Sequence, residues 1–373
     1  MSIFYEIEFA KYILPYPLTN GVAITCRFGG FMWHKYLEGE NMFYKNKISI
    51  VMCTYNGENY IVDQLNSIKR QTIQPDEIVI VDDASKDNTV NFVRKTMIGW
   101  EGNLILSIND VNLGYKKNFA KALQKATGDI IFLSDQDDWW EATKIEKQMM
   151  ALEAHPRILL CFHNALLVDK NLTSLGISFW DTLKFSPSSF ERNDYSRFSI
   201  DSIVQGCSCA LRRELVNISL PFCNEAHHDE WIAMNAIMNG GILPINECLL
   251  RYRQTGNNTL GASVEGFLDK ISKWINDMRD PMEMHIRDIY RKCDVWKAFI
   301  EKYGKEIPFL KISGLAYYKF LARRKSCFDE NKWWDLPSIF LYLNAYGTGA
   351  FAVKIYIKDH LMFLFRKKYF NRS

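Results

Sequence analysis

Residues 48–57 read Ile-Ser-Ile-Val-Met-Cys-Thr-Tyr-Asn-Gly, and residues 77–85 read Glu-Ile-Val-Ile-Val-Asp-Asp-Ala-Ser. Each stretch begins as a short apolar run and ends in polar residues. Between the two runs, Ile61, Leu65 and Ile68 have the spacing of one face of a helix. A buried strand, an amphipathic helix and a second buried strand form the repeating unit of a doubly wound sheet. This segment therefore predicts an α/β fold whose ligands bind at the carboxyl ends of the strands.

The same alternation continues along the chain. Further strands are expected at 104–108, 129–133, 158–168, 206–211 and 242–252, and helices at 87–95, 116–126, 141–155 and 228–239. Residues 169–203 carry no such pattern and are expected to be irregular, and the chain is expected to be helical and basic beyond residue 264. The predicted fold is thus a Rossmann-like, mostly parallel sheet flanked by helices. No GxGxxG follows the first strand, which argues against a dinucleotide site.

Composition excludes several classes of protein. With 373 residues and 48% hydrophobic content, the chain is long and apolar enough for a substantial core. Its 46 basic and 43 acidic residues nearly balance, which argues against a dedicated nucleic-acid binder. The nine cysteines contain no CxxC pair, so we expect buried thiols in a reducing compartment rather than a zinc site.

The sequence also bears on the place of the protein in the cell. Glu6, Glu8 and Lys11 interrupt the first 20 residues, so no secretory signal is predicted. The longest uncharged stretch, residues 336–353, contains Pro337, and a spanning helix is not expected there. These features predict a cytoplasmic enzyme.

Residues 1–45 do not join the strand–helix alternation. Met42 lies five residues before the first predicted strand segment at Lys47 and would be a natural start. The sequence leaves two interpretations open: an appendage, or an over-extended reading frame.

Five carboxylates follow the predicted strands, namely Asp82, Asp83, Asp135, Asp137 and Asp138. Carboxylates gathered at one sheet edge repel each other unless a cation or hydrogen-bond donors compensate. Mg²⁺ or Mn²⁺ is bound in proteins by one or two carboxylates together with phosphate oxygens. The alternative is a set of acids that only form turns, which Asp favours.

These segments resemble the motifs of glycosyltransferase family 2, which has the GT-A fold. The resemblance covers about residues 46–262 and rests on segments that occur in the family's order: 48–57, 80–85, 112–118, 135–138, 228–231 and 252–259. The last two, His-Asp-Glu-Trp and Tyr-Arg-Gln-Thr-Gly-Asn-Asn-Thr, are similar to the rhamnosyltransferase-like branch of bacterial polysaccharide enzymes.

The resemblance implies a set of donor-site residues. The nucleotide is expected to contact Thr54, Tyr55, Asn56, Asp83, Asn118, Asp135 and Arg253. Tyr55 would stack on the base and Asp83 would accept its imide N–H. Asp137 and Asp138 would bind Mn²⁺ or Mg²⁺, with their roles interchangeable, and Asp135 would support through the ribose or a water. Arg253 would meet the diphosphate, since Arg binds phosphate in a bidentate manner; a strand-end surface charge is the alternative.

The resemblance also implies the general base, Asp229. Inverting transfer requires a carboxylate that takes the proton of the acceptor hydroxyl as its oxygen attacks the anomeric carbon. The alternative for Asp229 is an acid that only interacts with the helix dipole. The sequence departs from the branch at Thr255, where the branch usually has His. This change predicts a weaker metal dependence or a different donor preference.

The sequence predicts three regions: an N-terminal extension at 1–45, the catalytic domain at 46–262 and a helical, basic region at 263–373. In the tail, residues 351–373, basic and aromatic residues alternate. Such a segment suits the surface of an anionic bilayer, here the inner face of the cell membrane. The alternative is a helix packed on the catalytic domain.

The function that the resemblance implies is inverting sugar transfer in the synthesis of cell-surface polysaccharide or O-antigen. The expected donor is dTDP-rhamnose, then a UDP-hexose, and the expected acceptor is a glycan or an undecaprenyl-linked glycan. A nucleotidyltransferase would typically need a Gly-rich, basic loop after the first strand, which residues 54–58 are not. A catalytically silent partner that binds nucleotide sugars or acts as a scaffold remains the alternative from another class.

Overall fold

The computed structural model describes the chain in several ranges. Side chains are described for residues 46–183, 185–188, 203–255, 286–304, 317–330, 332, 336–337, 341–342, 355–356 and 359–360, and the backbone alone for 24–28, 31–35, 280–285 and 310–316. Residues 1–45 and 46–373 form two compact units. In the first unit, β1 (Ile24–Phe28) and β2 (Phe31–Lys35) pair as an antiparallel hairpin.

Nine strands in the described part of the second unit form one sheet. Their order across the sheet is β5 (Asn103–Ile108), β4 (Glu77–Asp82), β3 (Ile48–Thr54), β6 (Ile130–Ser134), β10 (Ala210–Arg212), β8 (Leu160–Val168), β11 (Ile242–Arg253) and β7 (Trp139–Trp140), with β9 (Ser174–Ser178) paired to β8. Parallel pairs join β5, β4, β3 and β6, and also β8 and β11. The short β10 is antiparallel to both of its neighbours.

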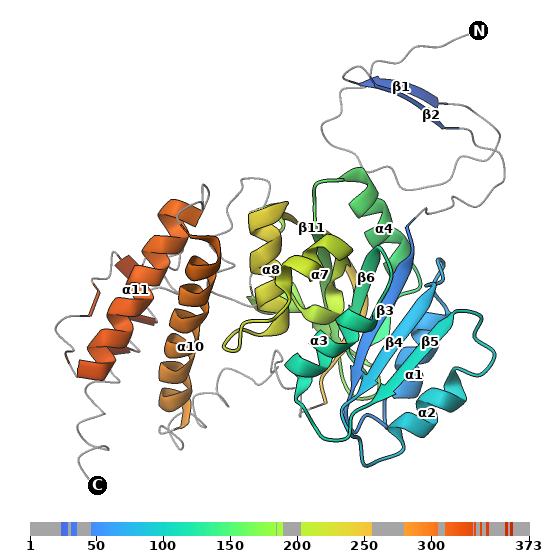
Figure 1. Ribbon diagram of the computed structural model, residues 1–373, viewed down its shortest axis with the longest axis horizontal. Helices are drawn as coiled ribbons and strands as arrows, with labels where there is room; N and C mark the ends of the chain where they lie inside the picture. Colours follow the sequence, from blue (N-terminus) through green and yellow to red (C-terminus); the bar gives the residue numbers. More distant parts are fainter. Residues whose placement is uncertain are drawn as a thin grey trace. The chain divides into compact units, whose positions relative to one another are not determined.

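Helices flank this sheet (Figure 1). They are α1 (Ile61–Lys69), α2 (Thr89–Thr96), α3 (Tyr115–Lys125), α4 (Lys144–Ala154), α5 (Phe179–Leu183), α7 (Arg213–Ser219) and α8 (His228–Asn239). Every residue of β4 and of β6 is buried, as expected for central parallel strands with apolar side chains on both faces. The predicted α/β class, with a mostly parallel sheet flanked by helices, is confirmed.

The parallel strands bring their polar ends to one edge of the sheet. Thr54 is paired with Asp82 at the ends of β3 and β4, and β6 ends at Ser134 beside β3. The loops that follow these strands carry the carboxylates found in the sequence. The expected position of the site at this edge therefore has a direct structural basis.

Two expectations about local structure were wrong. Residues 169–203 are not irregular throughout, because β9 and α5 lie within them. The Asp169 carboxylate accepts the N–H groups of Asn171 and Thr173, which forms the turn that returns β9 onto β8. Pairing with an existing strand compensates for the weak strand preference of Ser and Gly in β9. The strand expected at 206–211 begins only at Ala210, because Gly206–Ser208 form a 3₁₀ turn.

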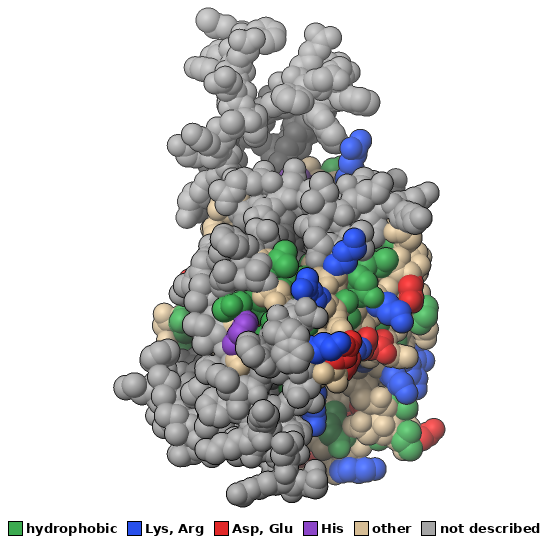
Figure 2. Space-filling model, turned by 90° about the vertical axis from the view of Figure 1, so that its left-hand side faces the viewer, with side chains coloured by type: hydrophobic (Ala, Val, Ile, Leu, Met, Phe, Trp, Pro, Cys, Tyr) green, Lys and Arg blue, Asp and Glu red, His purple; other side chains and the backbone are tan. Residues whose placement is uncertain are grey.

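The C-terminal region contains two long helices, α10 (Asp280–Tyr303) and α11 (Leu310–Glu330). Their aromatic side chains share a core with Trp231 of α8. Among the described residues, no helix combines the length and the apolar character needed to cross a bilayer. Figure 2 views the molecule from the side of these helices, where the described Lys and Arg side chains lie beside Asp and Glu side chains and among apolar and uncharged ones.

Most of the predicted membrane-facing tail, residues 351–373, lies outside the described residues. Its one acid, Asp359, is buried and forms an ion pair with Arg324 of α11 at 2.7 Å, and Tyr342 donates to the same carboxylate. Tyr356 packs against the Tyr342 ring, 5.3 Å between centroids. These contacts hold this part of the tail against other residues of the C-terminal region, and both the membrane surface and packing on the catalytic domain stay predictions.

Candidate active site

Asp82 organises the edge between β3 and β4. Its carboxylate accepts hydrogen bonds from the Thr54 hydroxyl (2.8 Å) and from the backbone N–H and hydroxyl of Ser85 (2.8 and 2.6 Å). Asp82 is fully buried, so this carboxylate shapes the turn. Thr54 is almost fully buried, and its hydroxyl donates to the Asp82 carboxylate. Its predicted contact with the donor stays a prediction.

Asp83 fixes the loop between β5 and α3. One carboxylate oxygen accepts the Leu113 N–H and the Asn109 side-chain amide, and the other accepts the Gly114 N–H, all within 2.8 Å. Gly114 has φ 81°, a left-handed conformation that suits glycine. The segment 112–114, found in the sequence, is therefore held against the residue predicted to bind the base.

Asn118 lies behind Asp83. Its amide nitrogen donates to the Val81 carbonyl at 2.7 Å, and its oxygen accepts from Asn109 at 2.9 Å. Asn118 is almost fully buried, and both ends of its amide bind protein groups. The structure thus gives Asn118 a supporting place in the loop network, and its predicted contact with the donor stays a prediction.

Tyr55 and Asn56 follow β3 with different exposures. The Tyr55 side chain is 47% exposed, as a stacking platform requires. Its backbone pairs with the Gln136 amide in both directions: Tyr55 N–H donates at 2.9 Å and its carbonyl accepts at 3.0 Å. Asn56 has φ 47°, and a Cβ on the next residue, Gly57, would lie 2.2 Å from Gln136 Oε1. Sequence reasoning missed Gln136, which joins Tyr55 to the loop containing residues 135–138, here called the carboxylate loop.

The carboxylate loop is the most crowded acidic group of the site. Asp138 is fully buried, whereas Asp135 and Asp137 are half-buried. Asp135, Asp138 and Cys207 place potential ligand atoms within 4.8 Å of one another. The Asp138 Oδ1 accepts the Arg253 N–H at 3.3 Å, but Oδ2 is buried without a hydrogen-bond partner among the described residues. A buried carboxylate oxygen with no donor, next to two further carboxylates, fits a divalent cation.

Burial makes all three carboxyl groups harder to ionise, and neighbouring negative charges add to the effect for Asp135 and Asp138. Burial raises the pKa of Asp135 to about 7, and the charges of Asp137 and Asp229 add to the effect. Burial also raises the pKa of Asp138, with the charges of Asp137 and Asp135 as further causes. Burial raises the pKa of Asp137 as well, against the opposing effect of Arg253. A bound cation would remove this repulsion.

The first prediction concerns the pH dependence of stability without metal. Asp135 ionises near 3.8 in an unfolded chain and near 7 in the folded protein, so its burial destabilises the fold progressively as pH rises between these values. We expect Asp135→Asn to raise the melting temperature in EDTA at pH 8, and to raise it by less than half as much at pH 5, because only part of the interval between the two pKa values has been crossed there. The measurement is a melting series of both proteins from pH 5 to 8. An equal difference at every pH would contradict the prediction.

Lys144 was not expected at the site. It lies at the start of α4, is fully buried and donates to the Cys207 carbonyl at 2.9 Å. Its ammonium lies 4.0 Å from the centroid of the Trp140 ring. Burial lowers its pKa to about 8, although the Cys207, Cys209 and Asp138 groups oppose that shift. Trp140 is also fully buried and packs in the core.

Arg253, at the end of β11, binds protein groups rather than solvent. Nε donates to the Asp137 carbonyl at 2.8 Å, one terminal nitrogen to the Lys170 carbonyl and the other to Asp63 at 3.0 Å. The guanidinium lies 4.7 Å from the centroid of the Tyr60 ring, and the side chain is 2% exposed. Its position beneath the carboxylate loop does not fit a strand-end surface charge, and its predicted contact with the diphosphate remains a prediction.

Asp229 lies in the first turn of α8. Its Oδ1 accepts the Glu230 N–H at 2.8 Å, and Oδ2 accepts the Gly206 N–H at 3.2 Å. Gly206 belongs to the 3₁₀ turn that replaced the expected strand. Because Asp229 is close enough to raise the pKa of Asp135, the fold brings the predicted base to the carboxylate loop from almost one hundred residues away.

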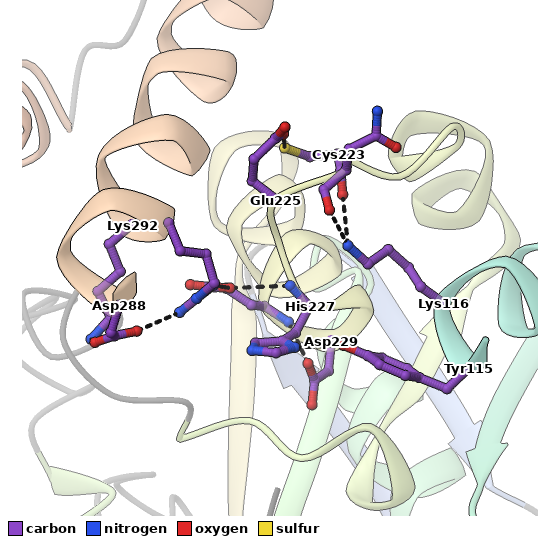
Figure 3. A network of polar contacts seen from close by, with 11 residues as sticks. Tyr115, Lys116, Cys223, Glu225, His227, Asp229, Asp288 and Lys292 are labelled. Carbon is purple, nitrogen blue, oxygen red and sulfur yellow. Dashed lines mark hydrogen bonds and ion pairs between the residues drawn. The ribbon is translucent and has the colours of Figure 1, made fainter. Parts of the chain in front are cut away.

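The start of α3 contacts the segment before α8 (Figure 3). The Tyr115 hydroxyl and His227 Nδ1 are 2.6 Å apart, and Lys116 donates to the Asn224 carbonyl. His228 is buried and stacks on Phe119 of α3, 4.3 Å between ring centroids. His228 is thus held in the core by its contact with Phe119, whereas His227 lies beside Asp229 and Tyr115.

Comparison with known families fits this arrangement. Residues 49–218 match the family model for glycosyl transferase family 2. The matched range contains the carboxylate loop and ends before Asp229, so the residue predicted to be the general base lies outside it.

Three curated relatives are similar in sequence. An uncharacterized protein of Mycobacterium tuberculosis is 27% identical over 56% of this chain and 58% of its own length. The dTDP-rhamnosyl transferase RfbG of Shigella flexneri is 28% identical over 57% and 74%. The UDP-Glc:alpha-D-GlcNAc-diphosphoundecaprenol beta-1,3-glucosyltransferase WfgD of Escherichia coli is 25% identical over 76% and 96%.

The matched part of this chain spans 58% of the length of the mycobacterial relative. The resemblance to glycosyltransferases is nevertheless confirmed for the segment that forms most of the sheet. Residues 49–218, which form most of the sheet and carry the strand-end carboxylates, are thus similar to glycosyl transferase family 2.

Proposed function

We propose that this protein transfers a sugar from a nucleoside-diphosphate donor to a hydroxyl group of a glycan, with inversion at the anomeric carbon. One observation carries the proposal: Asp229, which lies after the range that matches glycosyl transferase family 2, accepts the N–H of Gly206, and the next residue, Cys207, is grouped with Asp135 and Asp138 of the carboxylate loop. A carboxylate that can accept a proton and a group that can hold a diphosphate are the two requirements of this reaction.

The donor would bind along the sheet edge between Tyr55 and the carboxylate loop. The exposed Tyr55 ring would stack on the base, with Asp83 and Asn56 beside it. Asp135, Asp137 and Asp138 would hold Mg²⁺ or Mn²⁺. When bound, the ion neutralises the charge that develops on the leaving diphosphate. Arg253 keeps the backbone of the loop in place through the Asp137 carbonyl.

Asp229 would act as the general base. It takes the proton of the acceptor hydroxyl while the hydroxyl oxygen forms a bond to the anomeric carbon and the nucleoside diphosphate leaves. The N–H groups of Gly206 and Glu230 hold the carboxylate in a fixed orientation. Such a fixed orientation reduces the reorganisation needed during proton transfer.

The finer points of the function are also proposals. The relative RfbG is named as a dTDP-rhamnosyl transferase, which supports rhamnose as the first donor to test. WfgD is named for UDP-glucose and a diphosphoundecaprenol-linked acceptor, which supports UDP-hexoses next and a lipid-linked acceptor. An acceptor of that kind would require the protein to work at the inner face of the cell membrane, in the synthesis of a cell-surface polysaccharide. The region boundaries at 45/46 and 262/263 are part of the same proposal.

The test of the donor site is a thermal-shift panel of dTDP, UDP, GDP and CMP, each with and without Mn²⁺. We expect one nucleotide to raise the melting temperature, and the rise to depend on Mn²⁺. The nucleotide that does so identifies the base of the donor. If no nucleotide shifts the melting temperature, the proposal fails and the catalytically silent partner becomes the better interpretation.

A further inference from the structure

Helix α10 packs along α8, the helix that carries Asp229. At the first turn of α8, Arg291 and Glu230 form an ion pair, 2.6 Å between Nη1 and Oε2. Further along, the Phe299 ring meets the Trp231 ring edge to face, 5.8 Å between centroids, and Lys302 donates to Asn235 at 2.7 Å. The C-terminal region therefore contacts α8 with both polar and apolar groups.

The ion pair with Arg291 lies one residue from Asp229. Besides Arg291, the Glu230 carboxylate accepts the backbone N–H of His227 at 3.2 Å. The Glu230 N–H in turn donates to Asp229 Oδ1 at 2.8 Å. Glu230 thus joins the residue before α8, the predicted base and α10 in one network (Figure 3).

The ion pair between Arg291 and Glu230 is largely buried, so its loss should affect the structure more than the loss of an exposed pair would. The side chains of Arg291 and Glu230 are only 23% and 15% exposed. Arg291 also reaches Asp288 at 3.2 Å on its own helix, which holds the guanidinium in place. Exposed ion pairs contribute little, but removing one partner of a largely buried pair leaves an uncompensated charge. Here that charge would be Glu230, directly beside Asp229.

We propose that Arg291 of α10 is a positioning residue for Asp229, so that the C-terminal helices complete the active site. This inference rests on the proposed role of Asp229 as general base. Arg291 neutralises Glu230 and holds its carboxylate where it binds the His227 N–H. The first turn of α8, and with it the Asp229 carboxylate, is thereby fixed relative to the acceptor.

The experiment compares Arg291→Met and Arg291→Lys in the full chain, with Lys325→Met as the matched control. Lys325 forms an ion pair with Asp294 at 3.1 Å that joins α11 to α10 and does not involve α8. We expect Arg291→Met to lower kcat on the order of 10- to 100-fold, since small displacements of a reacting group have effects of this size. The KM for the donor should not change, Arg291→Lys should recover most of the rate, and Lys325→Met should behave like the wild type.

Unchanged kcat in Arg291→Met, or an equal loss in Lys325→Met, would overturn the proposal. Amide hydrogen exchange at residues 228–231 supplies a readout that does not depend on activity. Exchange there should be faster in Arg291→Met than in the wild type and in Lys325→Met. If the wild type transfers no sugar, the proposed function fails, and equal exchange in the three proteins would separately reject the role of Arg291. If Arg291→Met does not fold, Arg291→Lys, which keeps the positive charge, is compared with Glu230→Gln, which removes the ion pair. Equal amide exchange at residues 228–231 in these two variants also rejects the positioning role of Arg291.

Discussion

Asp229→Asn should lower the rate of sugar transfer by about 10²- to 10⁴-fold, the usual contribution of a general base. Asn keeps the size of Asp229 and one oxygen that accepts the Glu230 N–H, but it cannot take the proton of the acceptor hydroxyl. The expected result is therefore a fall in kcat with donor binding unchanged. Single-turnover transfer and donor titration by calorimetry measure the two quantities separately.

The control for this variant is Asp110→Asn, which makes the same chemical change at an exposed position in the loop after β5. It should transfer at the wild-type rate. Full activity of Asp229→Asn would show that another group takes the proton, and the helix-dipole interpretation of Asp229 would then be preferred. Loss of donor binding in Asp229→Asn would place this residue in the donor site.

Asp137→Ala should remove the metal-dependent part of donor binding. The ion and the diphosphate attract each other with a contribution of several kcal/mol, so we expect donor affinity in Mn²⁺ to fall by about 10²-fold or more. The melting temperature in EDTA should instead rise or stay the same at pH 8, because one of three crowded carboxylates is gone. Nucleotide titrations with Mn²⁺ and with EDTA test both statements.

Glu101→Ala, an exposed acid before β5, is the control for the loss of one carboxylate. Unchanged Mn²⁺ dependence in Asp137→Ala would assign the metal to Asp135 and Asp138 alone, the two carboxylates grouped with Cys207. The Thr255 departure from the rhamnosyltransferase-like branch is tested by the same titrations, because it predicts either a metal dependence weaker than that of the branch or a different donor preference.

Much of the fold could be predicted because its central strands are simple in sequence. The runs that became β3, β4 and β6 are mostly apolar, with Ser49 and Glu77 as exceptions, and their polar ends mark the edge where the carboxylates lie. Such runs are buried in any arrangement in which helices cover both faces of the sheet, so they can be recognised without knowing the rest of the fold. Strand β9 could not be found in this way, since Ser174–Ser178 forms a strand only through its pairing with β8.

Side-chain directions in the site could not be predicted either. From its residue type, Arg253 is expected to bind phosphate. In the structure its guanidinium nitrogens donate to the backbone carbonyls of Asp137 and Lys170, which are distant in the sequence. Lys144 reads as a surface residue of an amphipathic helix, yet it is buried under the site. Residue type fixes which bonds a group can make, and only the three-dimensional packing decides which partner is near.

The Gln136 amide binds the backbone of Tyr55, not its ring. The carboxylate loop is therefore connected to position 55 in a way that does not depend on which side chain stands there. With Tyr55 stacked on the base as proposed, an exchange of residue 55 should change the base preference without moving the acidic groups. Position 55 is accordingly where we expect donor choice to be altered, by selection or by engineering, at low risk to the chemistry.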